Sequence, residues 1–366
     1  MGHSGSTEVA AIAPVVPPET GVSILSGYPW EGVARLVDRA PSAHDLRVHR
    51  LELLAAALYR ERGLPVPPEL ASEALLAHMS TLAATAVLRR IRDACSGPLM
   101  LFKGLETSAR YPGPGLRPLG DVDVLAADPF AVQRELEAVG FESVRDDLDW
   151  DELHHLPRLG PPDRLFAVEV HKRPKWVAGL QAPSAEELFA DAVPSATGVE
   201  GILAPAPAVH AVILAAHAWA ERPLGCIGDL VDVVVMADGC ADGEVEDVVR
   251  RYGLARAWKT TTAAADALFA DGATTWPLRS WARQLPDARE RTVFESHLQR
   301  LLADFSALPP GRALRSAGRS LSQTVLPTQD EPWRAKLSRA KRAVRNAGTR
   351  RSEHERSLRD REEPDE

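Results

Sequence analysis

Two aspartates separated by one residue, Asp121 and Asp123, carry the strongest chemical signal in this chain of 366 residues. They lie in the run DVDVLA at 121–126, whose alternation predicts a β-strand. Alternate side chains of a strand face the same side, so the two carboxylates stand together while Val122 and Val124 point into a core. Paired carboxylates repel unless a cation separates them, and Mg²⁺ accepts such ligands together with phosphate oxygens. The pair indicates a magnesium site; a solvated strand end is the alternative.

A third carboxylate and several histidines follow in the chain. The run VEVH at 168–171 alternates in the same way, and this places Glu169 on the face opposite the two valines. If this strand neighbours the first one, Glu169 completes a two-cation site. For His171 a functional role and a hydrogen-bonded structural role are equally open, whereas the structural role is favoured for His154 and His155.

Three further residues are candidates for binding phosphate. The apolar run 99–102 predicts a buried strand that ends at Lys103 and Gly104, and a short helical segment follows at 106–111. Backbone N–H groups at such a turn can hold phosphate, with the Lys103 ammonium as a supporting charge. Arg117, four residues before the aspartate pair, could reach the same anion.

Both helices and strands must position these residues. Helical spacing predicts three helices between residues 31 and 95 and further helices from 207 to 302. Between these two regions, strands and helices alternate from 99 to 171, which favours a small mixed sheet with helices on one side. The predicted class is therefore α+β, a small mixed β-sheet core flanked by N-terminal and C-terminal helical regions.

The chain divides into five predicted regions. Residues 1–27 are an aperiodic, disordered lead-in, 28–95 the N-terminal helical region, 96–200 the α/β core, 201–308 the C-terminal helical domain and 309–366 a tail. Between Glu331 and Glu353 the tail has eight Lys or Arg residues and no acid, and its end is mixed in charge. We expect this tail to be disordered or a frayed helix.

Composition limits the location and the partners. The apolar runs are too short for a membrane span, the N-terminus lacks the pattern of a signal peptide, and three scattered cysteines form no CxxC pair, so we expect a cytoplasmic protein without a membrane partner. A formal charge of −8 makes DNA an unexpected partner. RNA binding by the basic tail is less favoured than a solvated segment.

The order of these motifs resembles a known family. The runs LFKG at 101–104, YP at 111–112, Arg117, DVDVL at 121–125 and VEVH at 168–171 are similar to the LKG, YP, R, DhDhhh and (E/D)hH pattern of an uncharacterised bacterial nucleotidyltransferase family in the DNA polymerase beta-like superfamily. The runs AAH at 215–217 and IGDL at 227–230 resemble its helical region. His217 and Asp229 in these runs are interpreted as a buried pair that supports packing.

The resemblance implies a nucleotidyltransferase core and a set of roles. Asp121, Asp123 and Glu169 would be the catalytic and metal-binding residues, holding two Mg²⁺ ions. Lys103 and Gly104 stand where many members have a Gly-Ser turn facing the triphosphate. The implied reaction transfers a nucleoside monophosphate from a triphosphate to an acceptor and releases pyrophosphate. ATP, CTP, GTP and UTP all stay open as donors, and a peptide, a protein, a sugar, another small molecule such as an antibiotic, or RNA as acceptors.

Two other functions compete with this one. A non-catalytic nucleotide-binding or protein-interaction module could retain the fold, although the intact Asp121, Asp123 and Glu169 argue against it. A metal-dependent hydrolase could use the same carboxylates together with His171. The product formed from a labelled triphosphate separates the three functions.

Overall fold

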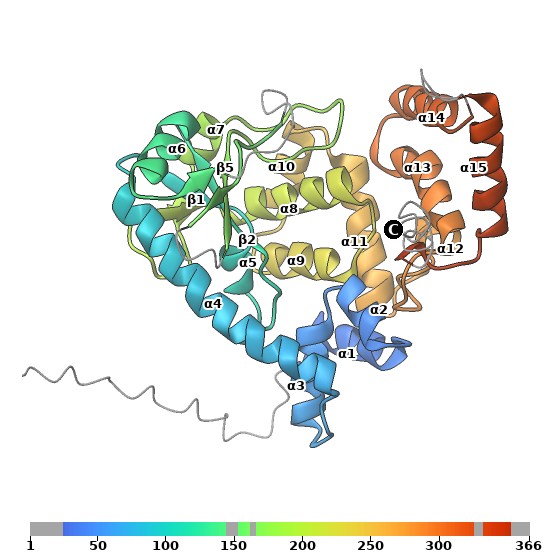
Figure 1. Cartoon of the computed structure of the whole chain (residues 1–366), viewed down its shortest axis with the longest axis horizontal. Coiled ribbons are helices and arrows are strands. Elements are labelled where there is room, and N and C mark those ends of the chain that lie inside the picture. The colour runs from blue at the N-terminus through green and yellow to red at the C-terminus, as the bar shows by residue number, and fades with distance from the viewer. Residues whose placement is uncertain (1–24, 144–152, 162–165, 326–331, 353–366) are drawn as a thin grey trace, which may run out of the picture.

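The computed structural model describes residues 25–143, 153–161, 166–325 and 332–352, and its centre is a single mixed sheet (Figure 1). The described strands pair in the order β3-β4-β5-β2-β1-β7-β6. β2 runs parallel to β5 and antiparallel to β1, which in turn runs parallel to β7. The strands are β1 (Leu99–Leu101), β2 (Asp121–Ala126), β3 (Glu142–Ser143), β4 (Leu159–Gly160), β5 (Ala167–His171), β6 (Val193–Pro194) and β7 (Ile202–Ala204). The predicted α+β class is confirmed.

Helices precede, interrupt and follow the strands. Those before the sheet are α1 (Trp30–Arg39), α2 (Ala43–Val48), α3 (Glu52–Glu61) and α4 (Pro68–Ala94). Those between strands are α5 (Leu105–Ser108), α6 (Pro129–Ala138) and α7 (Ala185–Ala190). Those after the sheet are α8 (Pro207–Glu221), α9 (Ile227–Ala237), α10 (Glu244–Arg251), α11 (Ala255–Phe269), α12 (Trp276–Ser280), α13 (Val293–Ala307), α14 (Pro310–Val325) and α15 (Trp333–Arg345).

Both faces of the sheet are covered, so the expectation of helices on one side is wrong. On one face the valines of β2 and β5 share a core with Val87 and Ile91 of α4 and with Leu136 of α6. On the other face Met100 and Leu125 belong to a larger core with residues of α8 and α9. The sequence of β2 shows one apolar face and one mixed face, and the mixed face is covered only by helices distant in the chain.

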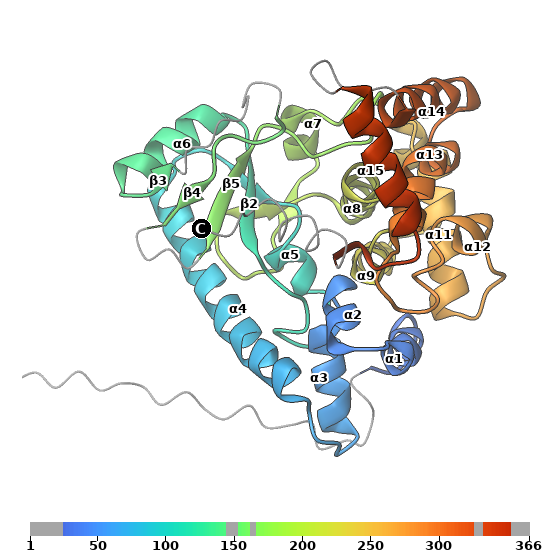
Figure 2. The same cartoon turned by 45° about the vertical axis from the view of Figure 1, so that its right-hand side comes forward.

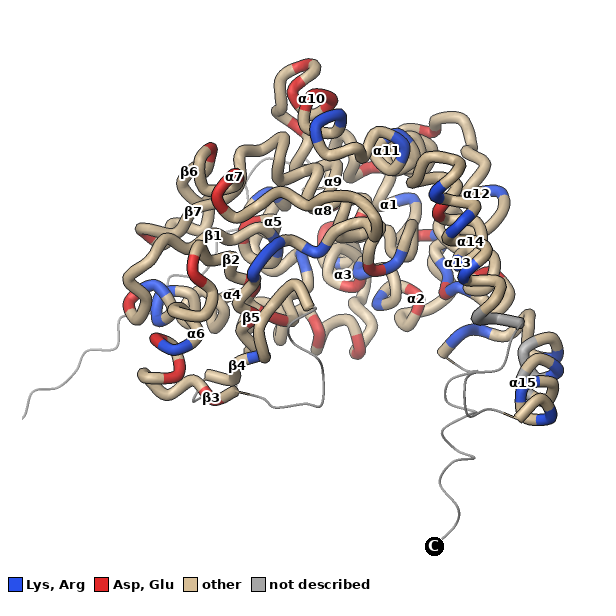
Figure 3. Tube along the Cα trace, turned by 90° about the horizontal axis from the view of Figure 1, so that it is seen from above, with Lys and Arg blue, Asp and Glu red and all other residues tan. Residues whose placement is uncertain are grey.

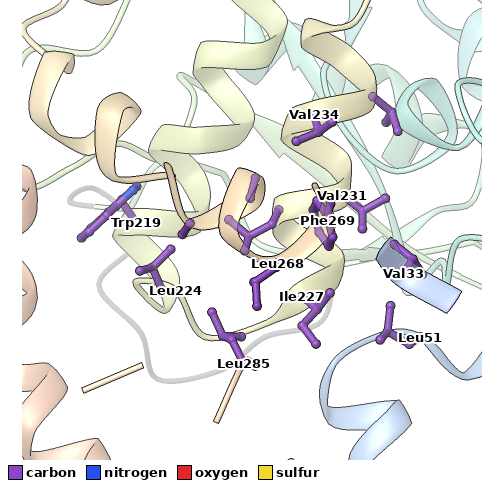
Figure 4. Close-up of a cluster of buried hydrophobic side chains, with 14 of the residues drawn as sticks. Val33, Leu51, Trp219, Leu224, Ile227, Val231, Val234, Leu268, Phe269 and Leu285 are labelled. Atoms are coloured by element: carbon purple, nitrogen blue, oxygen red, sulfur yellow. The ribbon is translucent and has the colours of Figure 1, made fainter. Parts of the chain in front are cut away.

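The larger core joins the N-terminal and C-terminal helices. Val33 of α1 and Leu51 lie near Ile227 and Val231 of α9, and Phe269 of α11 completes this contact (Figure 4). Gly32 of α1 has no room for a side chain, because a Cβ there would come within 2.3 Å of the Phe269 backbone. The N-terminal helices are thereby fixed against the C-terminal ones at one end of the molecule (Figure 2).

The predicted second N-terminal helix is broken in the structure. Ser42 caps α2 as expected, accepting a hydrogen bond from the Asp45 backbone N–H at 3.2 Å. The helix then ends, Arg50 adopts a left-handed φ of 58°, and α3 begins at Glu52. Four helices therefore replace the three expected before the sheet. Apolar spacing continues across the break, which is why periodicity alone missed it.

The tail, which the sequence predicts to be disordered or a frayed helix, has helices at 310–325 (α14) and 333–345 (α15). α14 and α15 both pack against α13, and Ala313 is fully buried. The chain then returns to the start of α13, where Val293 N–H bonds the Thr349 carbonyl at 3.1 Å. This return of the chain is held by backbone hydrogen bonds, which any residue can form, so the sequence contains no apolar pattern that predicts it. Lys and Arg residues mark α15 in Figure 3. Residues 1–24 of the predicted lead-in and 353–366 lie outside the described residues.

Among the described residues, α4 has the length and mean hydropathy that a membrane crossing requires, on those criteria alone. Its C-terminal half packs on the sheet through Ala84, Val87, Leu88 and Ile91. Figures 1 and 2 show it running from α3 to the sheet.

Candidate functional site

The pairing of β2 with β5 brings the predicted acidic residues together. In the parallel register Asp121 is opposite Ala167, Asp123 opposite Glu169, and Leu125 opposite His171. Paired residues of neighbouring strands share a face, so Asp123, Glu169 and His171 lie side by side on the face away from the buried valines. Each offers one ligand atom, and these atoms all lie within 4.8 Å of one another.

Asp123 is the most strongly held carboxylate of this group. It is 2% exposed, and its Oδ1 accepts hydrogen bonds from Lys103 Nζ at 2.8 Å and from His171 Nε2 at 2.7 Å. Burial would raise the pKa of Asp123, but Lys103 and His171 outweigh it and hold the pKa well below its usual range. Burial likewise opposes the charged form of His171, yet its bonds to Asp123 and Glu169 raise its pKa.

Glu169 is held in place on its other side. Arg158 Nε donates to Glu169 Oε1 at 2.6 Å, and His171 Nε2 lies 3.4 Å from Oε2. Burial and the charge of Asp123 would raise the pKa of Glu169, but the hydrogen bond from His171 and the charges of His155 and His171 lower it to about 2. His155 Nε2 is 4.0 Å from the same carboxylate, and His154 lies against the His171 ring at 5.3 Å between centroids. The predicted third carboxylate is therefore buried and ionised beside Asp123.

Asp121 differs from the other two carboxylates. It is only partly buried, and no basic side chain forms an ion pair with it in the described part of the chain. Burial and the nearby charge of Asp123 raise the pKa of Asp121 to about 6. The charge of Lys103 offsets only part of this rise.

A pocket of about 390 Å³ opens beside these residues. One side, here called the sheet wall, consists of Lys103, Gly104, Asp121 and Asp123. A second group of lining residues, the arginine wall, consists of Arg50, Arg117, Asp229 and Asp232. His217 and Arg222 complete the lining at the end of α8. Glu169 lies behind Asp123 and does not line the pocket.

Two guanidinium–carboxylate pairs make up the arginine wall. Arg117 is 6% exposed, and its Nε and one terminal nitrogen both donate to Asp232, at 2.9 and 2.8 Å. Tyr111 Oη donates to the same carboxylate at 2.7 Å. Arg50 donates to Asp229 at 2.8 Å and lies 3.8 Å from Asp232. Burial would lower the pKa of Arg50, but Asp232 and Asp229 raise it.

A model of a family described as uncharacterised nucleotidyltransferase matches residues 43–270, more than half of the chain. The chain belongs to this family. No curated protein and no solved structure matches the chain. The resemblance inferred from the motifs is confirmed at the level of the family, while the superfamily and a bacterial origin remain predictions. The matched range starts at α2 and ends with α11, so it contains both walls of the pocket.

The family motifs occupy different parts of this site. Asp121, Asp123, Lys103, Gly104 and Arg117 all line the pocket. Gly104 has a φ of 60° and ψ of −117°, a conformation that favours glycine, and it precedes α5, a helix of only four residues. The predicted roles of these residues in binding metal and phosphate remain predictions.

The interpretation of His217 and Asp229 as a buried pair is wrong. Asp229 bonds Arg50, whereas Nδ1 of His217 is buried without a hydrogen-bond partner among the described residues. Burial and the charge of Lys103 lower the pKa of His217 to about 3, so the ring is neutral at pH 7. The two residues lie on separate helices, each lining the pocket.

Sequence reasoning missed three charged residues of the pocket, namely Arg50, Arg222 and Asp232. Arg50 and Asp232 are separated from their partners by more than a hundred positions in the chain. A signal existed for Asp232, which stands between valines in the apolar part of α9, and a buried charge requires a partner. No comparable signal marked Arg50 or Arg222.

Proposed function

We propose that the protein is a magnesium-dependent nucleotidyltransferase that transfers a nucleoside monophosphate from a triphosphate to an acceptor. The observation that carries this proposal is the register of β2 and β5, which places Glu169 beside Asp123 and leaves Asp121 one step along the same face at the pocket. Membership of the nucleotidyltransferase family supports it.

The residues of the sheet wall fit a divalent cation. Asp121 and Asp123 supply hard oxygen ligands on the same face of β2, and Glu169 adds a third carboxylate. Asp121 forms no ion pair with a basic side chain among the described residues. These three residues would hold two Mg²⁺ ions. Bound magnesium would supply neutralisation of the triphosphate charge and a lowered pKa of the acceptor hydroxyl.

The other side chains fix and balance these carboxylates. His171 donates to Asp123, and Arg158 donates to Glu169, so both acids keep one orientation. The Lys103 ammonium, 15% exposed at the pocket, adds positive charge next to the site of the polyphosphate. In the proposed reaction the acceptor oxygen attacks the α-phosphorus, its proton leaves to solvent, and pyrophosphate departs with the electrons of the broken P–O bond.

One experiment identifies both the acceptor and the nucleobase of the donor triphosphate. Purified full-length protein is incubated in cell extract with Mg²⁺ and each α-labelled triphosphate in turn, ATP, CTP, GTP and UTP. We expect one or more of them to label a peptide, protein, sugar, other small molecule or RNA, and chelation of magnesium to abolish the label.

Three other outcomes contradict the proposal. Magnesium-dependent binding of a triphosphate without release of pyrophosphate would indicate a non-catalytic binding module. Label recovered only as free nucleoside monophosphate would indicate a hydrolase. Transfer that continues undiminished after chelation would exclude the metal.

A further inference from the structure

We propose that Arg50 is a substrate-binding residue that holds the polyphosphate of the donor nucleotide against the arginine wall. This inference rests on the proposed function, and it assigns the phosphate contact to a residue outside the sheet. Four observations support it: the backbone conformation of Arg50, the close approach of Gly228, the free donors of the guanidinium and the charge balance of the pocket.

The backbone at Arg50 is held in an unfavourable conformation. Its φ of 58° lies in the left-handed region, which residues other than glycine, asparagine and aspartate rarely occupy. Such strain persists where the surrounding structure imposes it. Here it turns the chain between α2 and α3, so that the Arg50 side chain lines the pocket. An ordinary helix junction does not require an arginine at this position.

Gly228 allows the strained turn to approach α9. Its backbone N–H donates to the His49 carbonyl at 2.9 Å. A Cβ at Gly228 would come within 2.9 Å of Arg50 Cβ and 3.1 Å of the His49 oxygen. Only glycine at this position of α9 therefore permits the contact that places Arg50 in the arginine wall.

Arg50 and Arg117 differ in their capacity to bind a ligand. All three side-chain nitrogens of Arg117 already donate, to Asp232 and to the carbonyls of Gly104 and Pro118. Arg50 makes one hydrogen bond, to Asp229, and its side chain is 26% exposed. A guanidinium carries five N–H donors in a fork that suits phosphate oxygens. Arg50 therefore has donors to offer, whereas those of Arg117 are committed to the protein.

The charge balance of the pocket favours an anion at this wall. Among the lining residues four arginines and lysines face four aspartates. If magnesium engages Asp121 and Asp123, only Asp229 and Asp232 remain to balance the four cations. One of these four cations, Arg222, is exposed at the pocket. A polyphosphate supplies the missing negative charge.

The test measures binding of tripolyphosphate with Mg²⁺ to full-length protein by calorimetry, so that no chemical step contributes. We expect Arg50→Gln to weaken binding by about 10-fold or more, since it removes a charged hydrogen bond. Arg62→Gln is the matched control, because Arg62 forms a two-point pair with Asp38 at 2.6 and 3.0 Å away from the pocket. Its Kd should equal that of the wild type.

Asp229→Asn separates binding from a structural ion pair. It removes the carboxylate that competes for Arg50 but keeps the arginine, so we expect tripolyphosphate to bind as tightly as to the wild type or more tightly. A merely structural Arg50 predicts equal losses of thermal stability for Arg50→Gln and Asp229→Asn with unchanged Kd for both. That result would overturn the inference. Arg50→Lys, which keeps the charge, should bind with intermediate affinity and serves if Arg50→Gln does not fold.

The Gly228→Ala variant tests whether the close contact between α9 and the turn at Arg50 is needed to place the Arg50 side chain in the pocket. We expect it to weaken tripolyphosphate binding, whereas Gly318→Ala in α14, where a Cβ meets nothing within 4 Å, should not. Label transfer measured on the same preparations separates the two proposals. If the wild type transfers label but Arg50→Gln leaves the Kd for tripolyphosphate unchanged, only the proposed role of Arg50 is wrong. If tripolyphosphate binding depends on Arg50 but the wild type transfers no label, only the proposed reaction is wrong.

Discussion

The two walls of the pocket contain the same kinds of charged residue but arrange them differently. In the arginine wall each aspartate has a guanidinium partner, and Asp232 accepts from both Arg117 and Tyr111. In the sheet wall Asp123 forms ion pairs with Lys103 and with His171 behind it, whereas no described basic residue forms an ion pair with Asp121. The difference indicates a division of work. The ion pairs make the arginine wall a rigid frame. In the proposed function, Asp121 of the sheet wall would bind a cation instead of a basic side chain.

The largest expected effect is that of a substitution in the sheet wall that lowers activity without lowering stability. Asp121→Asn should lower nucleotidyl transfer by ~10³-fold, because it removes a magnesium ligand worth several kcal/mol. It should leave the melting temperature unchanged or higher, since it removes repulsion with Asp123. Transfer rates and thermal unfolding of the same samples check both expectations.

The matched control for this variant is Asp128→Asn. Asp128 caps α6 just beyond the end of β2, and asparagine is an equally good cap. Its transfer rate should stay within about twofold of the wild type, as a surface change away from the site would. Near-normal transfer by Asp121→Asn would remove the distinction between the two walls.

In the arginine wall the main effect should be on stability. Asp232→Asn leaves the buried Arg117 without its carboxylate, so we expect the free energy of unfolding to fall by about 3 kcal/mol or more. Asp38→Asn, at the exposed pair with Arg62, should cost less than about 1 kcal/mol. Urea unfolding at pH 7 measures both. Equal small losses for the two variants would show that the wall is not a rigid frame.

The smallest effect concerns the contact between the sheet and α8. His210 is fully buried and donates from Nε2 to the Phe102 carbonyl at 2.8 Å; its burial lowers its pKa to about 4. The native state then binds fewer protons than the unfolded chain between pH 6.5 and 4, so stability is complete above pH 6.5 and is lost as the pH falls. His210 should account for about 2 kcal/mol of the stability lost from pH 7 to 5.

His210→Gln tests this contribution, because a glutamine amide can donate to the same carbonyl but does not titrate. Urea unfolding at pH 7 and pH 5 should show a shallower loss for the variant than for the wild type. The same dependence on pH in both proteins would assign the acid sensitivity to other groups, such as His49, whose pKa burial also lowers to about 4.

The sheet wall could be predicted from the sequence because its residues are close together in the chain. Alternation alone gave β2 its observed bounds, and the order of the runs at 101–104, 121–125 and 168–171 indicated the family. The pairing of β2 with β5 was a hypothesis that the register confirms. The strands β3, β6 and β7 have two or three residues each, too few for a pattern to identify.

The arginine wall could not be predicted in the same way. Arg50 and Asp229 are 179 positions apart, and Arg117 and Asp232 are 115 apart. Their pairing depends on how α9 packs against the turn after α2, which no local pattern encodes. Asp45 and His49 are likewise fully buried by contacts distant in the chain, since Asp45 accepts from the backbone N–H of Glu290 and His49 lies 2.8 Å from the Arg289 carbonyl.

The strained turn at Arg50 also limits how the protein can be divided. A fragment beginning at residue 96 would retain every carboxylate of the acidic triad, yet it would lack Arg50 and leave the flank of α9 uncovered. Truncation experiments aimed at a minimal catalytic unit should therefore begin no later than α2. Arg50 lies near the start of the matched sequence, more than 70 positions before the first residue of the acidic triad, Asp121.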